Sequence, residues 1–286
     1  MQLLNVPTPS PGIVWAVVRF MAAEGKSTPK KTITTYLEPG ELEAKNSGPV
    51  HHSLSTLKDL GLAVRSEDDN WSLSGGLEKI GVDDYAGFQR VTRAAVLGAD
   101  GEVPDPPDDI RRALAWILTR DPFKESFNWA TIDQLYNRSA PDGQLVLAND
   151  TRWPSLAAWG TALGMLAPAP HTASRHVPDC TRAVHQVLTD GLERGRSTDS
   201  MTVLQLLRSQ LPVLAGGALA VSLGYALDAP KVAGAALSFA LMRGEHEGWL
   251  LLGQDSDASV VINLHDPERS SARICSSITL LEGDDA

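Results

Sequence analysis

The stretch from Gly48 to Gly76, GPVHHSLSTLKDLGLAVRSEDDNWSLSGG, decides the fold class. Apolar residues recur every three or four positions in its first half, which places Val50, Leu54, Leu57 and Leu60 on one face of a predicted helix. Two short alternating segments, LAV and WSL, follow, and the polar turn RSEDDN separates them. This pattern is typical of a β-hairpin. The stretch therefore predicts a helix followed by a hairpin.

Two further helices are predicted before this stretch. The segment PGIVWAVVRFMAAEG begins with Pro11 and ends at Gly25, which is the usual placement of proline and glycine around a helix. A second helix is expected through KKTITTYL, with Ser27 or Thr28 as its cap and Pro29 in its first turn. Three helices and a hairpin in this order are typical of a winged helix-turn-helix, whose third helix enters the DNA groove.

The same order returns later in the chain. DDIRRALAWILTRDP, NWATIDQLYN and TRWPSLAAWGTALGMLAPAP match the three helices of the first unit in pattern, although not in identity. A fainter third copy is indicated by the helical segments SMTVLQLLRSQL and APKVAGAALSFALMRG and by the strands GWLLLGQ and SVVINL. We therefore expect a mainly α protein with short β-hairpins, of the α+β class, built from tandem winged helix-turn-helix units, two or three in number.

The predicted division of the chain has four segments. Residues 1–80 form the first winged helix unit, and residues 81–108 form a connecting helix and an acidic, proline-rich linker. Residues 109–188 form a second winged helix-like unit, and residues 189–286 form a helical and hairpin unit that is a candidate degenerate third winged helix. The linker LGADGEVPDPPDD is too polar to bury a core of its own.

Charge and hydropathy restrict the class of function. The chain of 286 residues carries a formal net charge of -10 and has a pI of about 5.1, which argues against broad nonspecific coating of DNA. No signal peptide is apparent at the amino terminus. The uncharged segment 209–227 is interrupted by proline and glycine, so it is not predicted to span a membrane. We expect a cytoplasmic protein without membrane partners.

The helix at 49–60 and its neighbours carry the candidate DNA-binding residues. Their side chains are cations, histidines or hydroxyls, which are the groups that contact phosphates and base edges, and they are predicted to face outward. The candidates are Lys30, Lys31, His51, His52, Ser55, Thr56, Lys58 and Arg65. An ordinary solvated helix face is the alternative. The acidic tip Glu67, Asp68 and Asp69 would be repelled by phosphate.

Catalytic and metal-binding motifs are not found. The chain has no phosphate-binding GxxxxGK[ST], no GxSxG nucleophile and no HExxH or CxxC, so we expect no enzymatic activity, no catalytic residues and no cofactor. HTASRHVPDCTRAVH does supply metal-ligand types at His171, His176, Cys180 and His185. Pro178 disfavours one helix that carries the ligands, and we favour ordinary histidines in a second hairpin over a metal site.

A family resemblance adds a biological context. The opening LLNVPTPSPGIVWAVVRFM, followed by a histidine-bearing third helix and a wing, resembles the DpdG family. That family is a component of bacterial gene clusters that insert 7-deazapurines into DNA and restrict foreign DNA. The resemblance implies a non-enzymatic accessory protein that works beside helicase-like and nuclease-like partners in phage defence. It assigns no individual functional residues.

Two other functions are compatible with the same pattern. Small acidic proteins with tandem winged helices serve as adaptor subunits of SMC-like complexes, and they bind partner proteins instead of DNA. A winged-helix transcription regulator would bind DNA as a symmetric homodimer. We favour an accessory protein of a DNA-modification or phage-defence system, which contacts DNA through the first unit and partner proteins through the others.

Overall fold

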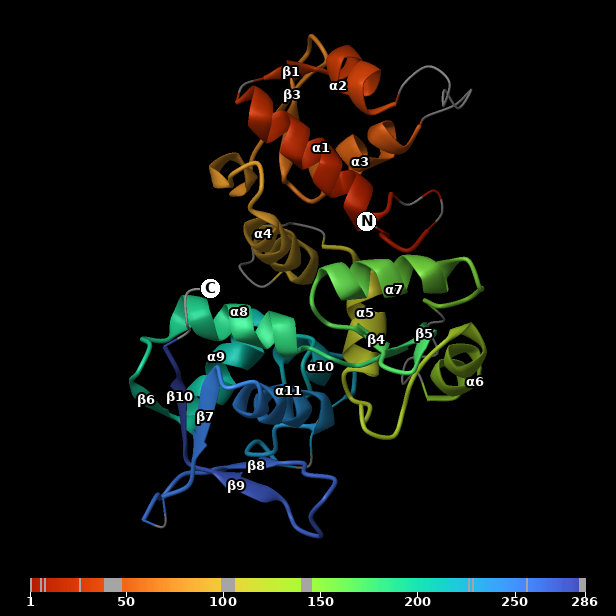
Figure 1. The fold of residues 1–286 in the computed structure, drawn as a ribbon. Coiled ribbons are helices and arrows are strands. Elements are labelled where there is room, and N and C mark those ends of the chain that lie inside the picture. Colours follow the sequence, from red (N-terminus) through yellow and green to blue (C-terminus); the bar gives the residue numbers. More distant parts are fainter. Residues whose placement is uncertain are drawn as a thin grey trace. The chain divides into compact units, whose positions relative to one another are not determined.

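The computed structural model describes residues 2–5, 7, 9–25, 27–38, 48–98, 106–139, 146–225, 227, 229–255 and 257–282. The protein is a mixed α+β fold in which helices accompany small antiparallel sheets (Figure 1), and this confirms the predicted class. Unit 1 comprises Met1–Ile110 and Thr151–Leu163, and unit 2 comprises Arg111–Asp150 and Gly164–Ala286. The four-segment division is finer and stays a prediction.

Unit 1 begins with three helices and a three-stranded sheet. Its strands pair in the order β1-β3-β2, and both pairings are antiparallel. Helix α1 contacts both of the helices that follow it (Figure 1). The elements are α1 (Pro11–Glu24), β1 (Thr28–Pro29), α2 (Lys30–Leu37), α3 (Pro49–Asp59), β2 (Ala63–Arg65), β3 (Asn70–Leu73), the 3-10 helix η2 (Leu77–Lys79), α4 (Tyr85–Leu97) and α7 (Arg152–Ala162).

The start and end of α1 follow from local chemistry. The Ser10 hydroxyl accepts a hydrogen bond from the Ile13 N–H at 3.3 Å, and Gly25 ends the helix at φ 63°. A left-handed residue at this position satisfies the last carbonyls and costs glycine no side-chain clash. The predicted first helix is thereby confirmed.

The predicted cap of the second helix is wrong. Neither Ser27 nor Thr28 caps it, because Thr28 and Pro29 form strand β1 and pair with Trp71 and Asn70 of β3. The helix begins at Lys30, whose N–H donates to the Asp69 carbonyl at 3.1 Å. The sheet edge therefore satisfies the backbone group that a side-chain cap was expected to satisfy.

The core of unit 1 is the one that the apolar spacing predicts. Val50, Leu54, Leu57 and Leu60 of α3 and the residue after it are at most 1% exposed. They lie among other buried side chains of the same unit, which are Val14, Val17, Val18, Ile33 and Trp71. Burial of this face is the main contribution of α3 to stability.

A carboxylate ties the amino-terminal segment of unit 1 to the start of α5 (Asp108–Ile117). Asp109 is 3% exposed and accepts the N–H groups of Leu3 at 2.9 Å and Leu4 at 2.7 Å. The Trp159 indole on α7 donates to the Pro9 carbonyl at 3.2 Å. Trp153 and Trp159 of α7 are both buried in the core.

The described part of unit 2 combines helices with three small sheets. The strand order is β6-β10-β7 in the largest sheet, and the pairs β4-β5 and β8-β9 are separate hairpins. The elements are α6 (Trp129–Ser139), β4 (Ala167–Ala169), β5 (Thr172–Val177), α8 (Thr181–Gly191), β6 (Ser197–Asp199), α9 (Ser200–Gln210), α10 (Ala218–Ser222), α11 (Ala235–His246), β7 (Leu250–Gly253), β8 (Ile262–Leu264), β9 (Arg273–Cys275) and β10 (Ser277–Leu280).

The order of elements recurs along the chain, as predicted. Each copy has a helix, a short strand or bridge, two helices and two strands, and the second of these strands pairs with both the first strand and the early strand or bridge. The copies are α1–β1–α2–α3–β2–β3, α5–Phe127–α6–α7–β4–β5 and α8–β6–α9–α11–β7–β10, with Phe127 bridged to His176 on β5. The third copy has the short helix α10 inserted between α9 and α11. The winged-helix interpretation of this order stays a prediction.

The predicted strand pair of the third copy is wrong. Both predicted helical segments form helices, α9 and α11, and α8 precedes them, largely outside the predicted third unit of residues 189–286. The predicted strand partner of β7, SVVINL, contains β8, which pairs with β9 instead. The partner of β7 is β10, so the β8–β9 hairpin is an insertion between the two strands of the third copy.

The structure also shows the conformation of the apolar segment 209–227 and the state of the two cysteines. Among the described residues, every helix is too short or too polar to cross a membrane, and in segment 209–227 only the end of α9 and the five residues of α10 are helical. Cys180 and Cys275 are buried free thiols.

We predict that Asp109→Ala lowers the free energy of unfolding by about 2–4 kcal/mol, since two buried N–H groups lose their acceptor. Asp108→Ala is the matched control. Asp108 is exposed in the same helical turn, so its loss removes a similar charge near the helix amino terminus and costs only about 0.5 kcal/mol. Urea unfolding followed by circular dichroism measures both, and equal losses would contradict the assigned role of Asp109.

Candidate nucleic-acid interface

The candidate residues lie on α2, α3 and the end of β2, all within unit 1. Two contacts hold these elements in place. The Val50 N–H in the first turn of α3 donates to the Glu38 carboxylate at 2.9 Å, and the Lys30 N–H at the start of α2 donates to the Asp69 carbonyl at 3.1 Å. The helices that carry the candidates are thus anchored to each other and to the hairpin.

Lys30 and the two histidines meet at one point of this surface. The Lys30 ammonium donates to Nδ1 of His51 at 3.0 Å, and the rings of His51 and His52 are 5.6 Å apart. Burial lowers the pKa of His51 below its ordinary value, and the positive charges of Lys30, His52 and Arg65 lower it further, against the opposing effect of Asp69. His51 is therefore mainly uncharged at neutral pH, and its Nδ1 accepts a hydrogen bond from the lysine.

Arg65 is held at the end of the hairpin by Asp69. Its Nε lies 2.7 Å from the Asp69 carboxylate, which also accepts the Trp71 indole N–H at 3.2 Å. Asp69 itself takes a left-handed φ of 58° in the turn. A guanidinium has five N–H donors in a planar fork. The bond to Asp69 orients Arg65 and uses only the donor on Nε.

The other candidates differ in exposure. Lys31 and Lys58 are exposed and Ser55 is half-buried, as a partner-facing surface requires. Thr56 is 7% exposed, so the prediction that it faces outward is wrong. Its position on the flank of the apolar face is covered because α3 contacts α1, α2 and β2 together. The remaining candidates form what we call the candidate surface: Lys30, Lys31, His51, His52, Ser55, Lys58 and Arg65.

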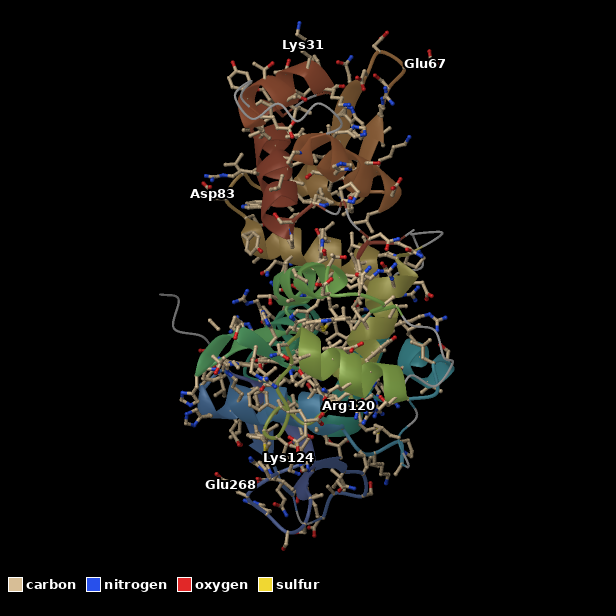
Figure 2. All side chains as sticks on the ribbon, turned by 90° about the vertical axis from the view of Figure 1, so that its right-hand side faces the viewer. Lys31, Glu67, Asp83, Arg120, Lys124 and Glu268 are labelled. Atoms are coloured by element: carbon tan, nitrogen blue, oxygen red, sulfur yellow. The ribbon has the colours of Figure 1, made fainter. Side chains whose placement is uncertain are left out.

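The tip of the hairpin is acidic, as the sequence indicates. Glu67 and Asp68 are exposed, and Figure 2 shows Glu67 and Lys31 both pointing away from the body of unit 1. The chain therefore presents a cationic surface on the helices and an anionic hairpin tip in the same unit. Phosphate would be attracted to the former and repelled by the latter.

The histidine and cysteine segment has other partners. The Cys180 thiol donates to the Ala236 carbonyl at 3.6 Å, and burial raises its pKa. The His185 ring packs edge-on against Trp249 at 4.5 Å, and His176 exchanges backbone hydrogen bonds with Phe127. Within the described ranges, no three His, Cys, Asp or Glu side chains are arranged to hold a metal ion.

Sequence reasoning missed one polar pocket in unit 2. It joins Lys124 to the segment 263–272, and Asp121 bonds to His265, 144 positions further along the chain. No motif links two segments so far apart, and the only signal was the charged and hydroxyl-rich run HDPERSSA after a strand-like segment.

The chain matches a known protein family. The model of a family described as DpdG-like matches residues 1–258. No curated protein and no solved structure matches the chain.

We predict that Lys30→Gln raises the pKa of His51, because the substitution removes a positive charge 3.0 Å from Nδ1. An NMR titration that follows the imidazole Cε1–H signal of His51 measures the change. Lys31→Gln, the adjacent lysine on α2, is the control and should leave this pKa nearly unchanged. Equal effects of the two substitutions would contradict the Lys30–His51 contact.

Proposed function

This chain belongs to the DpdG-like family, and we propose that it is a non-enzymatic accessory protein of the 7-deazaguanine DNA modification system that contacts DNA through unit 1. The family match covers most of the chain and supports the association with that system. The basic surface of unit 1 supports the proposed contact with DNA. Under this proposal the system acts in phage defence, and other surfaces of the chain bind its partner proteins.

The observation that carries the proposal is a cluster of basic side chains from α2, α3 and β2 on the surface of unit 1. Lys30, His52 and Arg65 lie close enough to His51 for their charges to lower its pKa, while the exposed Lys31 and Lys58 lie on α2 and α3. Ammonium and guanidinium groups on an exposed helix supply the phosphate contacts on which DNA affinity is built.

The order of elements supports a winged-helix mode of binding. A helix that carries the candidate side chains is followed directly by a hairpin, β2–β3, and an early strand, β1, closes the sheet. In winged helix-turn-helix proteins the corresponding helix lies in the major groove. The proposal therefore assigns groove contacts to His51, His52 and Ser55 and phosphate contacts to Lys30, Lys31 and Lys58.

We predict that the full chain binds duplex DNA with an affinity whose logarithm falls linearly with the logarithm of salt concentration. Lys31→Gln and Lys58→Gln should each weaken binding and reduce the magnitude of the salt slope by about one, since each removes one phosphate contact. Fluorescence anisotropy of a labelled duplex measures both quantities.

Lys79→Gln is the matched control for this experiment. Lys79 is also an exposed lysine of unit 1, but it lies on η2 and outside the candidate surface. Its substitution should change neither the affinity nor the slope. Absence of DNA binding, or a salt slope that the three substitutions change equally, would contradict the assigned surface.

A second candidate function is a protein-binding adaptor. It is favoured by the exposed acids Glu67 and Asp68 at the hairpin tip and by the exposed apolar side chains of Tyr36 (71%) and Val64 (57%). These groups suit a basic or partly apolar protein surface better than they suit phosphate. In this function unit 1 would bind a partner chain and not DNA.

The hairpin tip separates the two candidates. If unit 1 binds DNA with its hairpin near the backbone, replacing both acids in Glu67→Gln/Asp68→Asn should strengthen DNA binding by about 2- to 5-fold, because two like charges are removed from a screened contact. Anisotropy at low salt measures the change. If neither the wild-type chain nor this variant binds DNA, the result favours the protein-binding adaptor.

A further inference from the structure

Arg65, at the end of β2, is a cation of the candidate surface that a carboxylate holds in one orientation. Its Nε donates to Oδ1 of Asp69 at 2.7 Å, and its side chain is 50% exposed. Among the described residues, this bond to Nε is the one that the guanidinium makes, so its two terminal amino groups are available to a ligand. The guanidinium therefore combines a fixed orientation with access from solvent.

Asp69 is itself held from several sides. Its N–H donates to the Ser66 carbonyl at 3.2 Å, and its own carbonyl accepts the Lys30 N–H at 3.1 Å. The carboxylate oxygen that holds Arg65 also accepts the indole N–H of the buried Trp71 at 3.2 Å. Because both the backbone and the side chain of Asp69 are fixed, Arg65 is preorganised before any ligand binds.

Arg65 lies near the first turn of α3. Its positive charge contributes to the lowered pKa of His51, which is the third residue of that helix. In helix-turn-helix proteins the residues at the amino-terminal end of the recognition helix contact base edges in the major groove. If α3 enters the groove, Arg65 is therefore placed at the same base edges.

The surroundings of Arg65 favour a neutral base edge over a phosphate. The Asp69 side chain is 43% exposed, and Glu67 and Asp68 are exposed in the same turn. A phosphate bound to Arg65 would be repelled by these carboxylates, whereas a base edge carries no net charge.

Guanine is the base whose major-groove edge matches the free end of a guanidinium. It presents two neighbouring acceptors, O6 and N7, and a planar pair of amino groups donates to both. Adenine presents a donor beside N7, and thymine and cytosine lack this pair of acceptors.

We propose that Arg65 is a specificity-determining residue that recognises guanine in the major groove, with its two terminal amino groups donating to O6 and N7 of the base. This inference rests on the proposed contact of unit 1 with DNA. It has a direct consequence for modified DNA. Since 7-deazaguanine carries a carbon in place of N7, it keeps one of the two acceptors and loses the other, so the chain binds it more weakly than guanine.

Fluorescence anisotropy of the full chain with two labelled duplexes of the same G·C-rich sequence tests the proposal. In one duplex 7-deazaguanine replaces every guanine. The wild-type chain should bind the guanine duplex about 10-fold more tightly, since the analogue removes one hydrogen bond from a charged donor. Arg65→Gln should bind the two duplexes with nearly equal affinity. The comparison of the two ratios cancels any effect of the analogue on the duplex itself.

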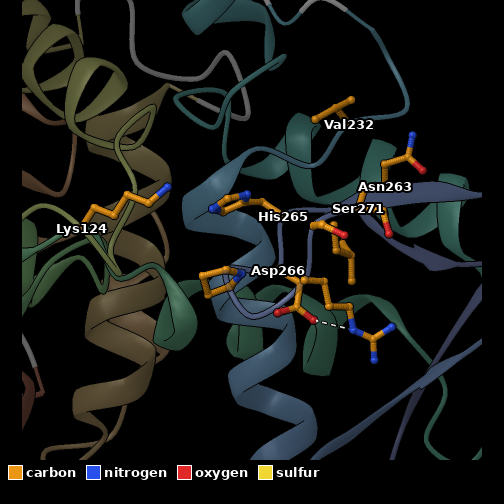
Figure 3. Close-up of a pocket in the computed structure, with 11 residues that line it drawn as sticks. Lys124, Val232, Asn263, His265, Asp266 and Ser271 are labelled. Carbon is orange, nitrogen blue, oxygen red and sulfur yellow. Dashed lines mark ion pairs between the residues drawn. The ribbon is translucent and has the colours of Figure 1, made fainter.

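Arg269→Gln is the matched control. Arg269 is an arginine of unit 2 whose Nε also pairs with an aspartate, Asp266, at 3.1 Å, and its side chain is 59% exposed. Figure 3 shows this pair as a dashed line beside the labelled Asp266. Its substitution should change neither the two affinities nor their ratio. Circular dichroism checks that each variant is folded, which we expect because exposed ion pairs contribute little to stability.

The outcomes separate this inference from the function on which it rests. Equal binding of the two duplexes by the wild-type chain, or a preference for guanine that Arg65→Gln retains, would overturn the role of Arg65 and leave the salt-dependent binding of DNA intact. Absence of binding to both duplexes would overturn the proposed function together with this inference.

Discussion

Burial of the apolar face of α3 is the constraint on which unit 1 depends. Leu54 and Leu57 are fully buried, so the helix cannot rotate without removing them from the core. His51 and Lys58 must then face outward, and the Glu38 carboxylate fixes the amino-terminal end of the same helix. The surface available to a partner is thus a consequence of core packing, and the hairpin at its edge adds the Arg65–Asp69 pair.

Much of unit 1 could be predicted because its pattern is local. Apolar spacing of three and four identifies α3, and proline and glycine mark the ends of α1. A local sequence pattern does not predict features that depend on packing between distant segments. Strand β1 has two residues and exists only because β3 pairs with it, and Thr56 is buried because three elements contact α3 at once. Neither fact leaves a signal in nearby residues.

Prediction is poorer in unit 2 for the same reason. The alternating segment SVVINL has the composition of a strand, but alternation does not identify its partner, and β7 pairs with β10, which follows the inserted β8–β9 hairpin. The pocket at this hairpin joins Asp121 and Lys124 to His265 and Arg269, and only the fold brings these residues together.

Photo-crosslinking to duplex DNA that carries bromodeoxyuridine tests the central claim most directly, because mass spectrometry then identifies the peptides that touch the bases. We expect crosslinks in peptides that contain α3, with His51 and His52, or the adjacent start of α2. Crosslinks confined to unit 2, or none above the level of a non-binding control protein, would contradict the claim that unit 1 holds the DNA.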